Sequence, residues 1–521
     1  MAKSRTKNSL INVMTSTGLQ LCSTILKFIV RTVFIHTLGK QFLGVNGLFS
    51  DILTMLSLTE LGFDTAINFK LYKPLVDKDE KRIRVLMKFY KQAYRVVGAV
   101  ILILGISLIP LLPVLIKDYD SLEVLGINAV VIFMLHIFRT VSSYLFFAYR
   151  SALIKADQKK YILDLVDILV EIANAIAKIL VLVFLKDFML YTATVIFFTI
   201  LKNGINAFIS HKMYPHIFQK EEESISKEEF HGLLKDCGAL FLYKVNNVVL
   251  KATDNMVLSY FLGLPVVGIY SNYLLLFNTL RQFLSKFYLS VKASTGNLFA
   301  TASMETKYKF FQTMNYITVV LYGTAGVGLA VCTNELIHVW AGEDYVVPQP
   351  FPILIGIELL TYGLMNNLGQ IRNVTGAFRQ MWHRPLLGIF INIISSVIFV
   401  QFIGIYGVIL GTITAVSLTN LIVDPVVIHK YSFENYKPVS GYYKRNLVYI
   451  MILALVGAGN LYLSSCFFVG YGWISVIVHA AIVAITVPGV FVLLYWKTEE
   501  NQYLLGIAKS LLKKFMKKHR S

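Results

Sequence analysis

The sequence has little charge for its length, and less acid than base. Only 15% of its 521 residues are charged, and 49 Lys and Arg stand against 30 Asp and Glu, so the formal net charge is +19. Apolar residues make up 56% of the chain, and the mean hydropathy is +0.63. These values exclude a disordered chain, a collagen, a coiled coil and a disulfide-stapled secreted fold. So much apolar surface fits about fourteen bilayer-spanning helices of some 21 residues each.

Several chemical signatures are missing. No Gly-rich phosphate loop followed by Lys and Ser or Thr occurs, so ATP hydrolysis has no support. The four cysteines are far apart and the ten histidines are scattered, without the spacing of metal ligands. The predicted external loops are short, the longest at about residues 334–350, which leaves no room for an extracellular catalytic domain. We therefore expect no enzymatic activity, cofactor or metal outside the membrane, and any chemistry must take place within it.

Fourteen apolar segments are long enough to cross a bilayer. They form a block of six, a second block of six and a final pair, at about residues 9–36, 44–66, 96–116, 124–147, 161–185, 190–211, 238–262, 266–288, 311–333, 351–376, 385–403, 405–428, 446–468 and 473–496. The blocks predict an N-lobe at 1–211, a cytoplasmic connector at 212–236, a C-lobe at 237–430 and two additional helices at 431–496. Residues 497–521 are expected to form a basic amphipathic cytoplasmic tail on the lipid surface.

The two blocks share a glycine pattern. Gly39 and Gly44 stand where the first predicted span meets the second, and Gly263 and Gly268 stand at the equivalent junction of the second block. An even number of spans in each block makes the two halves parallel repeats rather than inverted ones. The alternative is that any tight turn at a membrane surface recruits glycine, but the division into six, six and two spans favours a repeat.

The positive charge follows the membrane topology. Lys and Arg collect in alternate loops and at both chain ends, whereas the opposite loops hold only Lys40, Lys117 and Lys186. Short cytoplasmic loops carry such an excess, so both termini of this multi-pass plasma membrane protein are predicted to be cytoplasmic. The same placement explains the +19 charge by contact with membrane lipids, without nucleic acid as a partner.

Ionisable side chains inside apolar spans face a protein interior or a watery passage, because charge is costly in lipid. Seven such cations are candidate substrate-binding residues: Lys27, Arg31, Arg139, Lys178, Lys251, Arg281 and Arg372. Four carboxylates are assigned either to coupling with H⁺ or Na⁺ or to internal ion pairs: Glu60, Asp64, Glu171 and Asp254. Arg keeps its charge where a carboxylate can take up a proton, so an anionic ligand is favoured, and Arg and Lys are the side chains that meet phosphates.

Local motifs carry a resemblance to a known family. They are Asn8–Asn12, Leu38-Gly39, Gly44–Phe49 with the letters GVNGLF, and Leu58–Phe63 with the letters LTELGF. With these motifs and its overall organisation the chain resembles the Wzx-type oligosaccharide flippases, in the polysaccharide transport branch of the multidrug, oligosaccharidyl-lipid and polysaccharide (MOP) exporter superfamily. The motifs cover about the first sixty residues, and related exporters of lipid-linked substrates share them.

The resemblance implies a MATE-like fold of two six-helix lobes around a central cationic cavity, two further helices and alternating access. It implies an undecaprenyl-pyrophosphate-linked oligosaccharide as substrate, moved from the inner to the outer leaflet of a bacterial cytoplasmic membrane for surface polysaccharide assembly. Polymerase and glycosyltransferases are the partners that it implies. The alternatives are a lipid II-type peptidoglycan precursor flippase and a cation-coupled multidrug exporter of the same superfamily.

Overall fold

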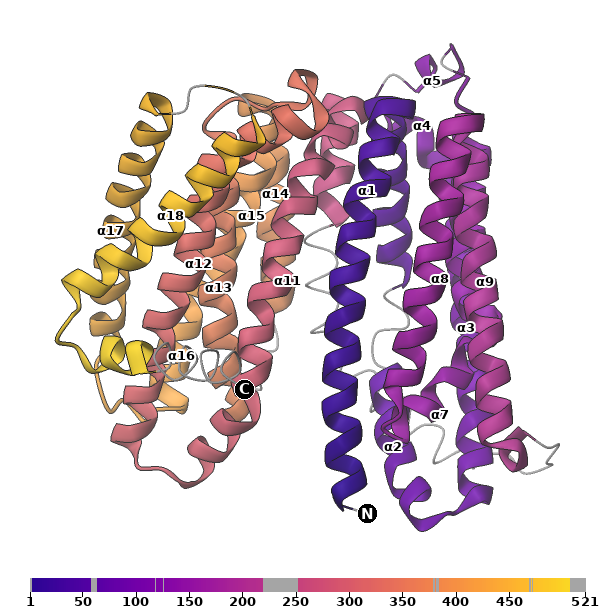
Figure 1. Ribbon diagram of the computed structural model, residues 1–521, viewed down its shortest axis with the longest axis horizontal. Helices are drawn as coiled ribbons and strands as arrows, with labels where there is room; N and C mark the ends of the chain where they lie inside the picture. Colours follow the sequence, from indigo (N-terminus) through magenta and orange to yellow (C-terminus); the bar gives the residue numbers. More distant parts are fainter. Residues whose placement is uncertain are drawn as a thin grey trace, which may run out of the picture. The chain divides into compact units, whose positions relative to one another are not determined.

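The protein is built from helices, as the computed structural model shows (Figure 1). The structure describes residues 2–57, 63–117, 119–124, 126–218, 252–377, 380, 384–467, 470 and 472–506. Over these ranges it contains no strand, and eleven of the described helices are long and apolar enough to cross a membrane. The predicted all-α polytopic membrane fold is confirmed.

The first of two compact units spans Met1–Gly268. Its main described helices are α1 (Ala2–Leu56), α2 (Phe63–Asp77), α3 (Glu80–Ser107), α6 (Ala129–Leu145), α7 (Ser151–Ala156), α8 (Lys160–Leu180) and α9 (Phe188–Met213). A further helical stretch covers 252–262, and α11 (Leu264–Thr301) begins in this unit. Within the unit α1 packs against α8, and α6 packs against α3 and α9.

The second unit spans Ile269–Ser521. It holds the rest of α11 followed by α12 (Met304–Ala341), α13 (Phe351–Thr375), α14 (Arg384–Ile403), α15 (Ile405–Val416), α16 (Val423–Tyr431), α17 (Val439–Cys466) and α18 (Trp473–Leu494). Here α12 packs against α13, α17 and α18, and α14 packs against α15.

The eleven long helices and the fourteen predicted spans differ for identifiable reasons. Helix α1 contains the first two predicted spans, because the backbone of Gly39 leaves helical geometry at φ 79° and the chain turns back there. The predicted span 238–262 lies mostly outside the described residues, and 266–288 falls in α11, whose many polar residues lower its hydropathy. The predicted connector also lies largely outside them, and the lobe boundaries stay predictions.

The paired glycines bring two turns into backbone contact within the first unit. A Cβ atom built on Gly44 would lie 2.0 Å from the main-chain oxygen of Leu264, and one on Gly268 would lie 2.1 Å from that of Lys40. The turns that precede them use Gly39 and Gly263, both with positive φ. The contact is reciprocal, as expected where two copies of one motif face each other.

Side-chain caps begin two of the helices that carry candidate site residues. The Asn128 side chain accepts a hydrogen bond from the Val131 amide at the start of α6. The Asp187 side chain accepts one from the Leu190 amide at the start of α9. Capping fixes where each helix begins and therefore which side chains face the neighbouring helices.

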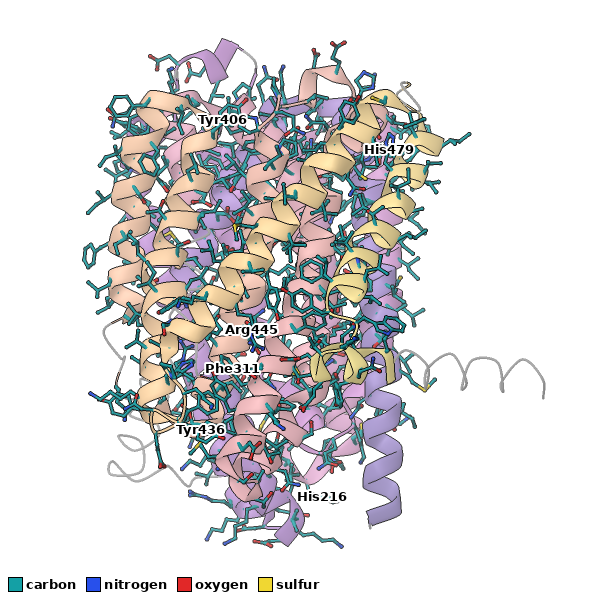
Figure 2. All side chains as sticks on the ribbon, turned by 90° about the vertical axis from the view of Figure 1, so that its left-hand side faces the viewer. His216, Phe311, Tyr406, Tyr436, Arg445 and His479 are labelled. Carbon is teal, nitrogen blue, oxygen red and sulfur yellow. The ribbon has the colours of Figure 1, made fainter. Side chains whose placement is uncertain are left out.

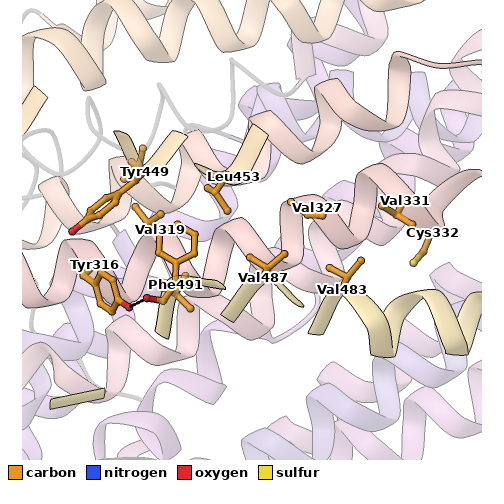
Figure 3. Close-up of a cluster of buried hydrophobic side chains, with 12 residues drawn as sticks. Tyr316, Val319, Val327, Val331, Cys332, Tyr449, Leu453, Val483, Val487 and Phe491 are labelled. Atoms are coloured by element: carbon orange, nitrogen blue, oxygen red, sulfur yellow. Dashed lines mark hydrogen bonds between the residues drawn. The ribbon is translucent and has the colours of Figure 1, made fainter. Parts of the chain in front are cut away.

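The core of the second unit lies where α12 meets α17 and α18 (Figure 3). Val319 and Val331 of α12 pack there with Leu453 of α17 and with Val487 of α18. Large apolar side chains also point outward, for example Phe402, which is 83% exposed. In a soluble protein so many exposed apolar groups would mark binding surfaces, but on membrane helices they meet lipid.

Candidate substrate-binding site

Four of the predicted cations belong to three helices of the first unit. We call them the cationic cluster: Lys27 and Arg31 of α1, Arg139 of α6 and Lys178 of α8. Lys178 lies within electrostatic reach of Arg139 and Lys27. Arg31 and Arg139 both lie within electrostatic reach of the Tyr191 hydroxyl. The structure therefore brings together residues that are up to 151 positions apart in the sequence.

Helix geometry determines which helix face carries Lys27 and Arg31 and how deep in the membrane the cluster lies. Lys27 and Arg31 are four residues apart and so share one face of α1. Arg31 stands eight residues before the turn at Gly39, and Arg139 stands ten residues after the start of α6. At a rise of 1.5 Å per residue these positions lie about 12 and about 15 Å from the helix ends. The cluster is therefore near the middle of a hydrocarbon layer about 30 Å thick.

Tyr191 of α9 supports the cluster and was not among the predicted site residues. Its ring lies 5.4 Å from the Lys178 Nζ atom, within the range of a cation–π contact. The ring packs against Phe34 at 5.1 Å and against Phe188 at 6.0 Å. An aromatic residue in an apolar span carries no sequence signal of its own, so only the fold shows that this ring faces a lysine.

Arg139 has a direct polar contact inside the unit. Its Nη2 atom donates a hydrogen bond of 3.0 Å to the Ser50 hydroxyl of α1. The next residue, Asp51, accepts a 2.6 Å hydrogen bond from the Asn255 side chain. The neighbouring Asp254, a predicted coupling carboxylate, is 6% exposed. The second half of α1 thus meets both α6 and the 252–262 helix through polar side chains.

The three carboxylates along α8 have different polar partners. Asp164 accepts hydrogen bonds from Ser16 and from Lys160, at 2.6 and 2.5 Å, near the start of the helix. Asp167 pairs with Lys202 at 3.7 Å. Glu171, further along, lies within electrostatic reach of Lys178. Of these three carboxylates, Glu171 is the one placed beside the cationic cluster.

Arg281 of the second unit lies among aromatic side chains. Its guanidinium carbon is 4.9 Å from the centre of the Tyr362 ring and 5.9 Å from that of Phe277. Glu358, one helical turn before Tyr362 on α13, is within electrostatic reach of Arg281. A guanidinium held over a ring keeps donor atoms at its edges, which are the atoms that bind phosphate or sugar oxygens.

Arg372 has a buried ionic partner. Its Nη1 atom lies 2.8 Å from the Asp424 Oδ2 atom, and the Nη1 atom of Arg384 lies 2.6 Å from the same oxygen. Asp424 is fully buried, and the two arginines are 8% and 6% exposed. The triad joins α13, α14 and α16. Arg372 was predicted as a substrate-binding residue, and the structure gives it an internal ion pair with Asp424, a carboxylate that was not among the predicted site residues.

Three of the other predicted site residues lie wholly or partly outside the residues that the structure describes. Lys251 and Glu60 lie outside the described residues. Asp64 belongs to α2, but its side chain lies outside them as well. In the part of the chain that is described, no three His, Cys, Asp or Glu side chains form a group that could hold a metal ion. The substrate-binding and coupling roles of all eleven residues stay predictions.

Comparison with known proteins shows which solved structures have a similar fold. No protein-family model matches the chain, and no curated protein matches it. Among solved structures, the lipid II flippase MurJ in an inward closed conformation is similar with a TM-score of 0.62 and 16% identity, over 92% of this chain and 99% of that one. An inward-facing multidrug resistance MATE family transporter of the MOP superfamily has a TM-score of 0.56 and 12% identity, over 80% and 96%. A Vibrio cholerae MATE transporter has a TM-score of 0.52 and 12% identity, over 82% and 98%. The chain thus has a MurJ- and MATE-like polytopic membrane fold.

Proposed function

We propose that this protein is a flippase that moves an undecaprenyl-pyrophosphate-linked oligosaccharide from the inner to the outer leaflet of the plasma membrane by alternating access. The head group would enter the protein while the lipid tail stays in the bilayer. The products would serve surface polysaccharide assembly, with a polymerase and glycosyltransferases as functional partners. Both chain termini would be cytoplasmic.

The observation that supports this function most is the cationic cluster at mid-membrane depth. Lys178 has two cations and one anion, Glu171, within electrostatic reach. Positive charges held near one another in a medium of low dielectric constant repel strongly, so an anion there is favoured. A pyrophosphate carries several negative charges and many acceptor oxygens, and Arg and Lys are the side chains that bind such groups.

The membrane potential favours transport from the inner to the outer leaflet. With the inside of the cell negative, moving an anion outward gains about 2.3 kcal/mol per charge for each 100 mV. Arg281 and Lys251 are further candidates for binding the head group on the sequence prediction alone. Coupling to H⁺ or Na⁺ through Glu60, Asp64, Glu171 or Asp254 is a further part of the proposal.

A lipid II-type peptidoglycan precursor is the alternative substrate, because it carries the same polyprenyl pyrophosphate. The likeness to MurJ concerns the fold and does not choose between the two sugars. A multidrug exporter has weaker support, because the cationic cluster would repel cationic drugs.

The test is lipid analysis after deletion of the gene and complementation with variants. We expect deletion to trap polyprenyl-pyrophosphate oligosaccharide on the cytoplasmic leaflet, and the trapped sugar identifies the substrate. Arg31→Ala and Arg139→Ala should fail to restore export although the protein reaches the membrane. Lys212→Ala is the matched control, because Lys212 is an exposed cation at the end of α9. Normal export by both cluster variants would refute the proposal.

A further inference from the structure

A buried imidazole joins three helices of the second unit. His479 of α18 is bonded to the Glu335 side chain of α12, with 2.8 Å between Nδ1 and Oε2. Its Nε2 atom lies 3.1 Å from the main-chain oxygen of Phe467, the C-cap residue that directly follows α17. The His479 side chain is 1% exposed, and that of Glu335 is 18% exposed. Both ring nitrogens therefore face oxygen atoms inside the protein.

Counting donors and acceptors shows that one extra proton is needed. A neutral imidazole has one N–H group, so with an ionised carboxylate one of its two nitrogens would point a lone pair at an oxygen lone pair. One added proton removes this conflict in either of two ways. The ring becomes a doubly donating imidazolium, or the carboxyl group becomes the donor to Nδ1 while Nε2–H donates to the carbonyl. Each arrangement satisfies both contacts.

We propose that Glu335 and His479 form a proton-binding site that fastens the start of α18 to α12 and to the end of α17. The ligand is a proton from the water at the nearby membrane surface. His479 lies six residues into α18, and Glu335 lies six residues before the end of α12, so each is about 9 Å from its helix end. The partly exposed carboxylate gives the proton a way in. This site is independent of the function proposed above.

The surroundings favour a positive ring at this position. The carbonyl at the end of α17 carries the negative end of the helix dipole, which stabilises a cation. On α12, Cys332 lies within electrostatic reach of Glu335, and His338 follows it by one turn. Within Trp473–Leu494 no side chain other than that of His479 is ionisable, and α17 has no charged residue after Arg445.

The proton controls one end of α18 only. Val483, Val487 and Phe491 hold the middle and the far end of the helix in the apolar core (Figure 3). Figure 2 shows His479 near one end of the unit and Tyr436 near the other. Loss of the proton should therefore loosen the first two turns of α18 while the rest of the helix stays docked.

Hydrogen–deuterium exchange on the full-length protein in lipid nanodiscs tests the proposal. The amide exchange rate of residues 473–481 is divided by that of residues 484–494. The pH dependence of the intrinsic exchange chemistry is common to both segments and cancels in this ratio. We expect this ratio to be roughly threefold to tenfold higher at pH 8.5 than at pH 5.5, which is the effect of one lost hydrogen bond. An unchanged ratio in the wild-type protein would overturn the proposal without any variant.

Variants identify the group that titrates. His479→Gln has a single NH2 group, a carbonyl oxygen that cannot donate and no titrating ring, so it can satisfy only one of the two contacts and its ratio should be high at both pH values. His479→Lys has donors only, so its ratio should be low at both. His338→Gln removes the neighbouring imidazole and should keep the wild-type response. A pH response that persists in His479→Gln, or disappears in His338→Gln, would assign the proton elsewhere.

Discussion

The glycine contact of the first unit gives a quantitative test of the structure. Replacing Gly44 by Ala places a methyl carbon 2.0 Å from the main-chain oxygen of Leu264. Real Cβ contacts stay above 3.0 Å, so the two segments must separate by at least about 1 Å. Neither side can yield by rotating a side chain, because the obstacle is backbone in a helix that is already packed.

The expected loss of stability in Gly44→Ala is the difference between two opposing effects. Forcing an extra methyl group into a packed contact costs about 1–3 kcal/mol, and the upper end applies where backbone must move. Alanine in place of glycine stabilises a helix by up to about 1 kcal/mol, because of its higher helix propensity. The net loss should be about 2 kcal/mol, which lowers the melting temperature of a unit of this size by roughly 4 °C or more.

The assay is thermal unfolding of the full-length protein in detergent, followed by the loss of helical circular dichroism, because all four tryptophans lie after residue 339, outside the first unit. Gly204→Ala is the matched control, since Gly204 lies in α9 with nothing within 4 Å of its added Cβ, so its melting temperature should stay level or rise. Gly268→Ala should resemble Gly44→Ala, because its Cβ meets the oxygen of Lys40. The double variant should lose less than the sum, because one separation relieves both clashes. Equal melting temperatures for Gly44→Ala and Gly204→Ala would refute the contact.

Three substitutions at two further positions test the partners of the cations. Asp424→Asn leaves Arg372 and Arg384 without their carboxylate, so we expect a loss of about 3–5 kcal/mol, measured as a lower melting temperature or a smaller yield of folded protein. An unchanged melting temperature would show that the triad is unimportant for stability. Tyr191→Phe keeps the ring beside Lys178 and should retain most transport, whereas Tyr191→Leu removes the cation–π contact and should reduce transport several-fold at normal protein level. Equal glycan output from the two Tyr191 variants would contradict the role of the ring.

Much of the fold could be predicted because it depends on patterns that lie along the chain. Apolar segments of bilayer length predicted a helical membrane protein, and the four glycines predicted the two turns that the structure brings into contact. The division of α1 at Gly39 also follows from a residue that tolerates positive φ. The number of separate spans is less certain from sequence, because polar residues in α11 lower the hydropathy of a helix that the fold nevertheless forms.

The candidate site could be predicted only where spacing carries the information. Lys27 and Arg31 share a helix face by their separation of four residues, and their charge in an apolar span is visible directly. The partner of a charge is set by packing between distant segments. The predicted spans 351–376 and 385–403 leave Arg384 in the loop between them, yet it is buried at the first turn of α14 against Asp424, 40 residues away. Tyr191 was missed for the same reason.

The cationic cluster and the Asp424 triad differ in how the charge of their cations is neutralised, and we expect this difference to separate structural from substrate-binding residues. In the triad, one Asp424 oxygen accepts hydrogen bonds from two guanidinium groups, so each arginine already has a charged partner at contact distance. Lys178 instead has an aromatic ring at contact distance and Glu171 within electrostatic reach, which together lower the cost of holding the ammonium group in the membrane. With Arg139 and Lys27 nearby, an arriving phosphate gains more at Lys178 than at Arg372. Substituting Arg372 should therefore reduce stability first, whereas substituting Lys178 should reduce transport.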